Sequence, residues 1–213
     1  MRTGIALFDF DKTIIVKDSI LILFNKTYRA HPEYLGGIFS GSIKTLFRGK
    51  AEFRETIKSD FLSMLNYYSP EELRDFVLRE LLPKYAFQEA VEAVAQCKEE
   101  GLHTLLVSAS AEEYLQYVGE VLPFDGILGT KLDENYRIIG RNNRFREKVY
   151  RINQYLIEHD LELDFDASRG YSDSYAADHP MLEMVKDRYL INEKKTFPGY
   201  TNLSWRQVGL SSL

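Results

Sequence analysis

The amino-acid sequence predicts an α/β protein, a Rossmann-like doubly wound parallel sheet with an inserted all-helical cap. Three observations predict this fold. Residues 5–8 form an apolar segment typical of a buried strand. The stretch that follows, residues 19–82, is rich in aromatic residues, has helical spacing and contains no convincing strand. Strand-like and helix-like segments then alternate. We therefore expect residues 1–16 and 84–213 to form the core domain and residues 17–83 the cap.

The bulk composition limits the class of protein. A chain of 213 residues with 45% hydrophobic composition can bury a full core. The single Cys97 cannot form an internal disulfide and no leader precedes Ile5, so we expect a cytoplasmic protein. The apolar runs are far shorter than the about 20 residues of a membrane span, so no integral membrane segment is expected. A net charge of −5 with scattered basic residues argues against nucleic acid as a partner, and the oligomeric state stays open.

Local signals place the remaining elements. Ser69-Pro70-Glu71-Glu72 is a capping box that begins a helix at Pro70, and Pro83 is expected to end it. Gly101 is suited to end the next helix. Asp133-Glu134-Asn135 is typical of a hairpin turn, whereas the tail at residues 196–213 shows no clear pattern. We expect further helices at residues 88–100, 112–121 and 146–158, and strands at residues 103–107, 127–129, 168–171 and 189–191.

Two carboxylates follow the first predicted strand. Residues 8–13 read Phe-Asp-Phe-Asp-Lys-Thr, so Asp9 and Asp11 project to the same side of an extended backbone. Two like charges held this close raise each other's pKa unless a cation lies between them, which favours a hard divalent ion. The alternative for this motif alone is an acidic turn after a strand.

A hydroxyl and a lysine follow later elements. The strand that begins at His103 is followed by Ser108, whose hydroxyl and following backbone N–H groups are suited to phosphate oxygens at a helix N-terminus. Ser108 could equally cap the next helix, and Ser110 is the better cap candidate because Glu113 lies three residues later. Lys148, near the start of a predicted helix, is by itself typical of a solvated surface residue.

Acidic residues follow a later strand. Tyr171-Ser172-Asp173-Ser174 ends that strand, and Asp178 lies five residues beyond Asp173. Clustered acids suggest a cation site, although Asp173 could instead be the N-cap of the next helix. Because ligands bind beyond the carboxyl ends of parallel strands, we expect all of these motifs to meet in one site.

The order of these motifs resembles that of a known family. Asp-x-Asp-x-Thr after the first strand, a serine ending a later strand, a lysine opening a helix and an Asp-Ser pair followed by a second Asp occur between residues 5 and 190. Together they resemble the signature motifs of the haloacid dehalogenase superfamily. Residues 107–110, 148–152 and 171–174 look most like its phosphoserine-phosphatase-like branch, which carries a helical cap after the first strand. The helical block at residues 19–82 falls where that cap belongs.

The resemblance implies a Mg²⁺-dependent phosphatase that acts on a small-molecule phosphomonoester through a covalent aspartyl-phosphate. Asp9 would be the nucleophile. Asp11 would be the general acid and base, and its backbone carbonyl would reach the metal. Asp9 and Asp173 would hold Mg²⁺, with support from Asp178, although close relatives often place that second acid four residues after the first. The metal would offset the repulsion between the nucleophile and the substrate.

The resemblance also implies which groups bind the phosphate oxygens. Ser108, the N–H of Ala109 and Lys148 would take these oxygens and stabilise the transition state, with Lys148 the most important. Thr13 would help to hold the first loop and is included among the phosphate-binding residues.

The leaving group is expected to differ from serine. Phosphoserine phosphatases bind the substrate ammonium with an acidic residue after the first motif and the carboxylate with a cap arginine. Asp18 fits the acidic role, but the arginine position aligns near Asp60, whose charge would repel a carboxylate. Ala109-Ser110 also replaces the glycine-rich stretch of those enzymes. We therefore expect free phosphoserine to be a poor substrate.

Two other functions stay open at this point. A phosphotransferase would use the same aspartyl-phosphate with an acceptor hydroxyl in place of water. A noncatalytic binding protein of the same fold is disfavoured, because loss of catalysis usually removes the nucleophile or a metal-binding acid and all of these residues are present.

Overall fold

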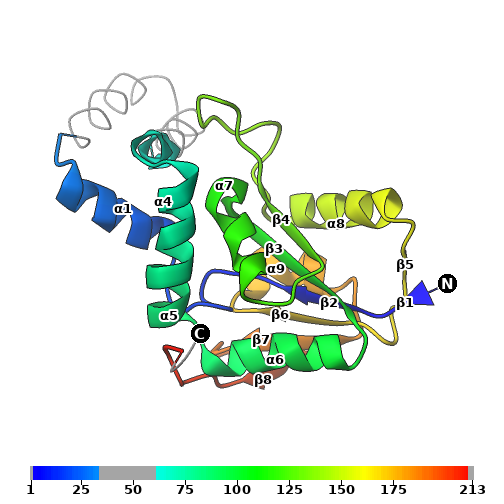
Figure 1. Cartoon of the computed structure of the whole chain (residues 1–213). Helices are drawn as coiled ribbons and strands as arrows, with labels where there is room; N and C mark the ends of the chain where they lie inside the picture. Colours follow the sequence, from blue (N-terminus) through cyan, green and yellow to red (C-terminus); the bar gives the residue numbers. More distant parts are fainter. Residues whose placement is uncertain (1, 34–60, 211–213) are drawn as a thin grey trace, which may run out of the picture.

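The core of the protein is a parallel sheet (Figure 1). The computed structural model describes residues 2–33 and 61–210. Within these ranges six strands pair in parallel in the order β4-β3-β2-β6-β7-β8. Their bounds are β2 Ile5–Phe8, β3 His103–Ala111, β4 Gly126–Thr130, β6 Arg169–Ser172, β7 Asp187–Ile191 and β8 Thr201–Leu203. This order confirms the predicted doubly wound sheet, with the strand that precedes Asp9 at its centre.

Helices cover both faces of the sheet, which explains why β2 is apolar throughout. Ile5 and Leu7 pack against helices α8 and α9, whereas Ala6 and Phe8 belong to the cluster that includes α6 and α7. All four side chains are fully buried, because alternate residues of a strand point to opposite faces. Figure 1 shows α8 and α6 on opposite sides of the sheet. The bounds are α6 Gln88–Glu99, α7 Glu112–Leu115, α8 Arg146–Glu158 and α9 Tyr175–Leu182.

Most of the predicted elements lie where the sequence indicates, and two extend differently. Helix α6 ends before Gly101, whose φ of 79° is the left-handed conformation expected there. Strand β3 continues four residues beyond the predicted range, through Ser108 to Ala111. The predicted helix after it is α7 followed by a 3-10 turn, η3, Gln116–Glu120. The predicted hairpin contains a single antiparallel bridge, between Leu132 and Ile138.

The predicted end of a helix at Pro83 is wrong. Helix α4 (Pro70–Asp75) begins with the predicted capping box, in which Ser69 Oγ accepts from Glu72 N at 3.2 Å. The chain then continues through a π-helical turn, η2 (Phe76–Leu81), into α5 (Leu82–Tyr85). The N–H of Leu82 bonds to Val77 O, so the wider turn brings Pro83 to the start of the next turn, where its missing N–H is tolerated.

Two other helices of the predicted cap lie within the described residues. They are α1, Ser19–Ala30, and the 3-10 helix η1, Ser63–Tyr67. Residues 34–60, including Asp60, lie outside the described residues, so the predicted boundary of the cap at residues 17–83 stays a prediction.

The C-terminal tail adds structure that its pattern does not predict. Strand β8 extends the sheet beside β7, and Trp205 is 7% exposed with its ring near those of Phe87 and Tyr171. A second, two-stranded sheet joins β1 (Arg2–Thr3) to β5 (Glu162–Leu163). Among the described helices, none is both long and apolar enough to span a membrane. The predicted cytoplasmic location stays a prediction.

Candidate active site

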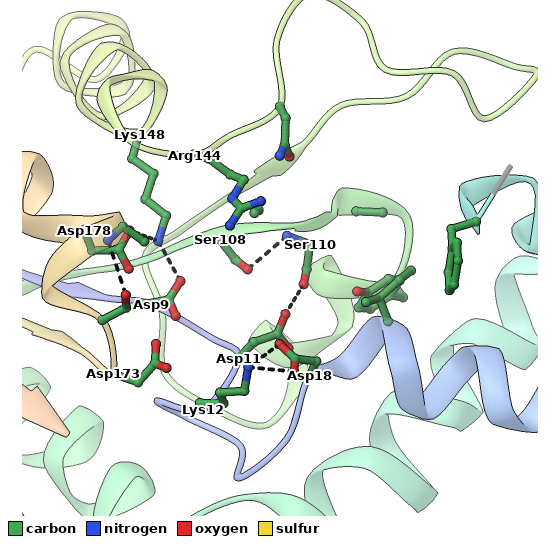
Figure 2. A pocket seen from close by; sticks show the side chains of 18 of the residues that line it. Asp9, Asp11, Lys12, Asp18, Ser108, Ser110, Arg144, Lys148, Asp173 and Asp178 are labelled. Carbon is green, nitrogen blue, oxygen red and sulfur yellow. Dashed lines mark hydrogen bonds and ion pairs between the residues drawn. The ribbon is translucent and has the colours of Figure 1, made fainter. Parts of the chain in front are cut away.

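The predicted site residues line one pocket at the carboxyl ends of the strands (Figure 2). Its volume is about 690 Å³. The predicted residues on its wall are Asp9, Asp11, Asp18, Ser108, Ala109, Lys148, Asp173 and Asp178. The pocket lies where an open parallel sheet is expected to bind its ligand. The sequence-based expectation that the motifs meet in one place therefore agrees with the geometry.

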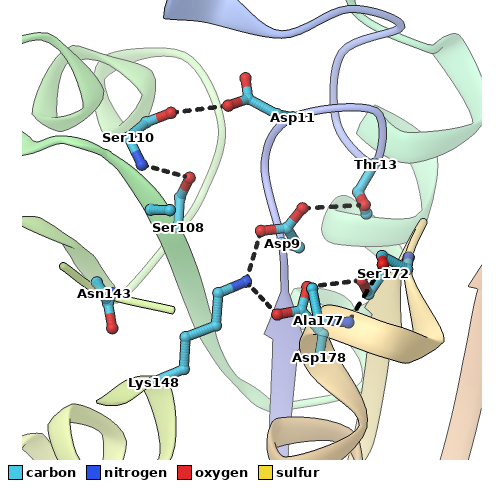
Figure 3. A network of polar contacts seen from close by, with 12 residues as sticks. Asp9, Asp11, Thr13, Ser108, Ser110, Asn143, Lys148, Ser172, Ala177 and Asp178 are labelled. Atoms are coloured by element: carbon cyan, nitrogen blue, oxygen red, sulfur yellow. Dashed lines mark hydrogen bonds and ion pairs between the residues drawn. The ribbon is translucent and has the colours of Figure 1, made fainter. Parts of the chain in front are cut away.

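A buried ammonium group connects two carboxylates at the base of this pocket (Figure 3). Lys148 Nζ lies 2.6 Å from Asp9 Oδ1 and 2.8 Å from Asp178 Oδ1. Lys148 is 2% exposed, so the reading of Lys148 as a solvated surface residue is wrong. The other oxygen of Asp178 accepts from Ser172 Oγ at 2.7 Å, which fixes the carboxylate toward Lys148. Helix α9 thus brings Asp178 into the site despite its longer spacing from Asp173.

Burial and charge shift the pKa values of this pair in defined directions. Burial raises the pKa of Asp9 to about 8, against the attraction of Lys148, and Asp178 and Asp173 raise it further. Burial alone would lower the pKa of Lys148, but the attraction of Asp9 and Asp178 outweighs it and the pKa is raised. Lys148 is therefore held as an ammonium beside the candidate nucleophile.

Asp11 is held by two donors on the opposite side of the loop. Its Oδ1 accepts from the backbone N–H of Ser19 at 2.7 Å and its Oδ2 accepts from Ser110 Oγ at 2.9 Å. Burial raises its pKa, although these hydrogen bonds work against the shift. A carboxyl whose pKa is raised is suited to donate a proton to a leaving group.

Ser110 does not cap the helix after β3, so that prediction is wrong. The N-cap of α7 is Ala111, which makes no side-chain capping bond, because β3 continues to that residue. The hydroxyl of Ser110 instead bonds to Asp11 and lies 3.1 Å from Ser19 Oγ. Ser19 Oγ in turn lies 2.8 Å from the hydroxyl of the buried Tyr114. This chain of hydroxyls positions Asp11, and no motif in the sequence signals it.

The end of β3 turns its polar groups toward the pocket. The register between β3 and β4 shifts between Val107 and Ala111, which marks an irregularity of the bulge type. Ser108 is 1% exposed and its Oγ accepts from Ser110 N at 3.0 Å. Ala109 lines the pocket beside it, and its carbonyl accepts from Thr130 Oγ1 at 2.9 Å. These contacts fix the backbone that would face the phosphate oxygens.

Thr13 makes contacts that position two loops of the site, and its predicted part in phosphate binding stays a prediction. It is fully buried and does not line the pocket. Its Oγ1 accepts from the backbone N–H of Asp173 at 2.9 Å and lies 3.4 Å from Asp9 Oδ2. Thr13 therefore ties the loop after β2 to the loop after β6.

The N-cap of α9 is Ser174, so the alternative role of Asp173 as that cap is excluded.

The donor set suits a hard divalent cation. Burial raises the pKa of Asp173 to about 6, and the charge of Asp178 adds to the shift. A cation near Asp9 and Asp173 would favour their ionised forms, and carboxylates are the ligands that Mg²⁺ prefers. In residues 2–33 and 61–210 no three acidic, His or Cys side chains are grouped as a ready metal site. Metal binding by Asp9, Asp11, Asp173 and Asp178 therefore stays a prediction.

The pocket wall includes charged residues that the sequence did not single out. Lys12, in the left-handed conformation with φ of 61°, pairs with Asp18 at 2.7 Å. Arg144 lines the pocket from the loop before α8. Lys12 occupies a variable position of the Asp-x-Asp-x-Thr motif, and Arg144 belongs to no motif. Only the positive charge of Arg144 so near Lys148 could have drawn attention to Arg144.

Comparisons with known proteins place the chain in a family. The model of the haloacid dehalogenase-like hydrolases matches residues 6–183. A protein of Streptomyces azureus named "Inhibition of morphological differentiation protein" is 27% identical, over 88% of this chain and 71% of that protein. Its name describes that protein alone. The family match confirms the resemblance that the motifs predicted.

Solved structures share the fold. A protein of unknown function from Bordetella pertussis Tohama I is 26% identical with a TM-score of 0.71, over 93% of each chain. A phosphoserine phosphatase, solved as a phospho-aspartyl intermediate analogue, is 15% identical with a TM-score of 0.56, over 90% of this chain and 87% of its own. A protein described as a HAD family hydrolase, from Salmonella enterica serovar Typhi, is 17% identical with a TM-score of 0.63, over 91% of this chain and 64% of its own. These matches confirm the predicted Rossmann-like fold.

Proposed function

This chain belongs to the haloacid dehalogenase-like hydrolases, and from that membership we propose that it is a magnesium-dependent phosphomonoester hydrolase with a covalent aspartyl-phosphate on Asp9. The observation that carries the proposal is the buried ion pair at the end of β2, where Lys148 Nζ lies 2.6 Å from Asp9 Oδ1. A carboxylate and an ammonium held together at the base of a pocket are suited to attack and stabilise a phosphoryl group. The shared fold of solved phosphoserine phosphatases supports the same reaction class.

In the first step Asp9 attacks phosphorus and the bond between phosphorus and the leaving oxygen breaks. Asp11, whose pKa is raised by burial, gives its proton to the leaving alkoxide. In the second step water attacks phosphorus, Asp11 takes the proton from that water, and the bond to Asp9 breaks. Inorganic phosphate leaves and both carboxyl groups return to their starting state.

The other site residues neutralise the charge of the phosphoryl group or hold the metal. Lys148 and Ser108 would take the oxygens of the transferred group, where charge increases in the transition state. Mg²⁺ bound by Asp9 and Asp173, with Asp178 in support, would offset the repulsion between the nucleophile and the phosphate.

The predicted cap would shape the leaving-group side of the site. Ile20, Phe61 and Leu62 line the pocket and lie within residues 17–83. The buried Tyr114 of the core lines it as well. Apolar and aromatic side chains on this side favour a leaving group larger or less polar than serine, selected by the cap.

The proposal is tested by measuring phosphate release from a panel of small phosphomonoesters with and without Mg²⁺. Activity that needs Mg²⁺ and is lost with EDTA would support it, and release from none of the esters would contradict it. Added alcohols separate hydrolysis from transfer, because a phosphotransferase would form the new ester in place of free phosphate.

Replacement of Asp11 with asparagine is expected to lower kcat by about 10² to 10⁴ and to change KM little, because the amide cannot exchange the proton. The side chain keeps its shape, so the fold is retained. Ser110→Ala removes only one hydrogen bond to Asp11, so its kcat should fall less than that of Asp11→Asn. Steady-state kinetics of the three proteins check this, and a kcat for Asp11→Asn within a factor of a few of the native value would contradict it.

Free phosphoserine is expected to rank low among the substrates. Asp18, the residue that would bind the substrate ammonium, pairs with Lys12 at 2.7 Å, so a substrate ammonium would have to compete with Lys12 for this carboxylate. Asp60, the other residue behind this expectation, lies outside the described residues. Measuring kcat/KM for phosphoserine beside sugar, nucleotide and aromatic phosphates checks the ranking. First place for phosphoserine by a wide margin would show that the expectation is wrong.

A further inference from the structure

Arg144 is a pocket-lining cation that the proposed mechanism does not use. Among residues 2–33 and 61–210, three cations line the pocket, and two of them are paired: Lys148 with Asp9 and Asp178, and Lys12 with Asp18. Arg144 forms no ion pair with any residue in the described ranges, and its guanidinium lies 5.5 Å from the ring centroid of the neighbouring Phe145. Figure 2 shows this guanidinium entering the pocket above Ser108. Arg144 is exposed to solvent, and no carboxylate of the described residues neutralises its charge.

The backbone that carries Arg144 is anchored through the preceding residue, Asn143. Asn143 is fully buried, and its side-chain Nδ2 donates to Leu128 O at 2.7 Å. The backbone N–H of Asn143 donates to Thr130 Oγ1 at 3.1 Å. On the other side Phe145 has a φ of 53°, which is uncommon for a residue other than glycine, and α8 begins directly after it. The hydrogen bonds of Asn143 hold the loop against β4 and so fix the position of the Arg144 backbone.

The surrounding carboxylates are engaged elsewhere. Asp9 and Asp178 face Lys148, and Asp11 accepts from Ser19 and Ser110. Arg144 forms no described ion pair with Asp9, so it lies farther than Lys148 from the atom that would attack phosphorus. In the proposed mechanism Lys148 and Ser108 take the oxygens of the transferred phosphoryl group, so the guanidinium of Arg144 is left for another part of the substrate. Its planar fork of donors matches a carboxylate or a phosphate.

We propose that Arg144 binds a second anionic group on the leaving group of the substrate, either a carboxylate or a second phosphate. The preferred substrates are then phosphomonoesters that carry this additional anion and no ammonium group, since an ammonium would compete with Lys12 for Asp18. The inference rests on the proposed function and names the substrate class of the same site.

The test compares esters that differ only in the second group. 3-Phosphoglycerate and glycerol 3-phosphate differ by a carboxylate in place of a hydroxymethyl group, and propanediol bisphosphate and 3-hydroxypropyl phosphate differ by a second phosphate. The native protein is expected to prefer the doubly anionic member of at least one pair. In Arg144→Gln that preference in kcat/KM should fall by about tenfold or more, mainly through KM, because a charge-assisted hydrogen bond is lost. The pair that responds identifies the anion as carboxylate or phosphate.

Arg146→Gln is the matched control. Arg146 is an exposed arginine two residues along the chain that does not line the pocket, so this variant should keep the native preference. Thermal unfolding of both variants should match that of the native protein, because neither guanidinium is paired in the described structure. Equal losses for both members of each pair in Arg144→Gln would place Arg144 on the transferred phosphoryl group and overturn the proposal. An unchanged preference in both pairs, or no native preference, would also overturn it.

Binding separates this inference from the proposed function. Calorimetric titration of Asp9→Asn and of Asp9→Asn with Arg144→Gln, using the same four esters, measures recognition without turnover. Weaker binding of only the doubly anionic esters in the second protein supports the role of Arg144, even if no ester is hydrolysed by the native chain. Equal binding by the two proteins overturns that role, whatever the native activity.

Discussion

Replacement of Asp9 with asparagine is expected to abolish phosphate release and to leave the chain folded. The amide has the shape of the carboxylate but cannot attack phosphorus to form an acyl phosphate. The fold should tolerate the change, because burial already disfavours the charged form of Asp9 and Lys148 keeps Asp178 as a partner at 2.8 Å. Initial rates with the best substrate of the panel and a thermal unfolding curve measure the two effects.

A carboxylate outside the site provides the control for this variant. Asp166 is an exposed acid in a surface pair with Lys186, so Asp166→Asn makes the same chemical change far from the pocket and should keep native activity. Substantial Mg²⁺-dependent phosphatase activity in Asp9→Asn would remove Asp9 from its role as nucleophile. Loss of the folded state in Asp9→Asn would show instead that its charge supports the fold.

Replacement of Lys148 with methionine is expected to lower both activity and stability. Methionine fills a similar space but leaves Asp9 and Asp178 buried without their ammonium partner. Removing one partner of a buried ion pair destabilises a protein by about 3 to 5 kcal/mol. The rate should fall by on the order of 10² or more, as expected for the loss of one preorganised donor to the transition state. Denaturant unfolding without metal and steady-state kinetics with Mg²⁺ measure these losses.

Lys98→Met makes the same substitution at the surface. Lys98 pairs with Asp125, and its side chain is 42% exposed, so the loss of stability should stay below about 1 kcal/mol and activity should not change. Similar stability in Lys148→Met and Lys98→Met would mean that the buried pair does not support the fold. A rate of Lys148→Met equal to that of the native protein would show that Lys148 takes no part in catalysis.

The sequence predicts the core of the fold well because local patterns and burial agree there. β2 is an uninterrupted apolar run because helices cover both of its faces, and Gly101 ends α6 because it can take a positive φ. Asp9 and Asp173 directly follow strands of one parallel sheet, and Ser108 lies near the carboxyl end of another, so the parallel order of the strands brings all three to one edge.

Other features depend on contacts that no local pattern encodes. Pro83 continues a helix because a π-helical turn precedes it, and that turn leaves no recognisable signal in the sequence. Ser110 resembles a helix cap, yet β3 extends past it and its hydroxyl bonds to Asp11, 99 residues away in the chain. Lys148 resembles a surface lysine until α8 packs on the sheet and buries its side chain.

The covalent intermediate provides the most direct test of the proposed mechanism. The native protein is mixed with Mg²⁺ and an excess of its best substrate, quenched in acid during turnover, and treated with borohydride, which reduces an acyl phosphate to an alcohol. Peptide mass spectrometry then locates the reduced residue. We expect homoserine in place of Asp9, and none in Asp9→Asn or without substrate. Phosphate release by the native protein with no homoserine at position 9, or with the modification at another residue, would contradict an aspartyl-phosphate on Asp9.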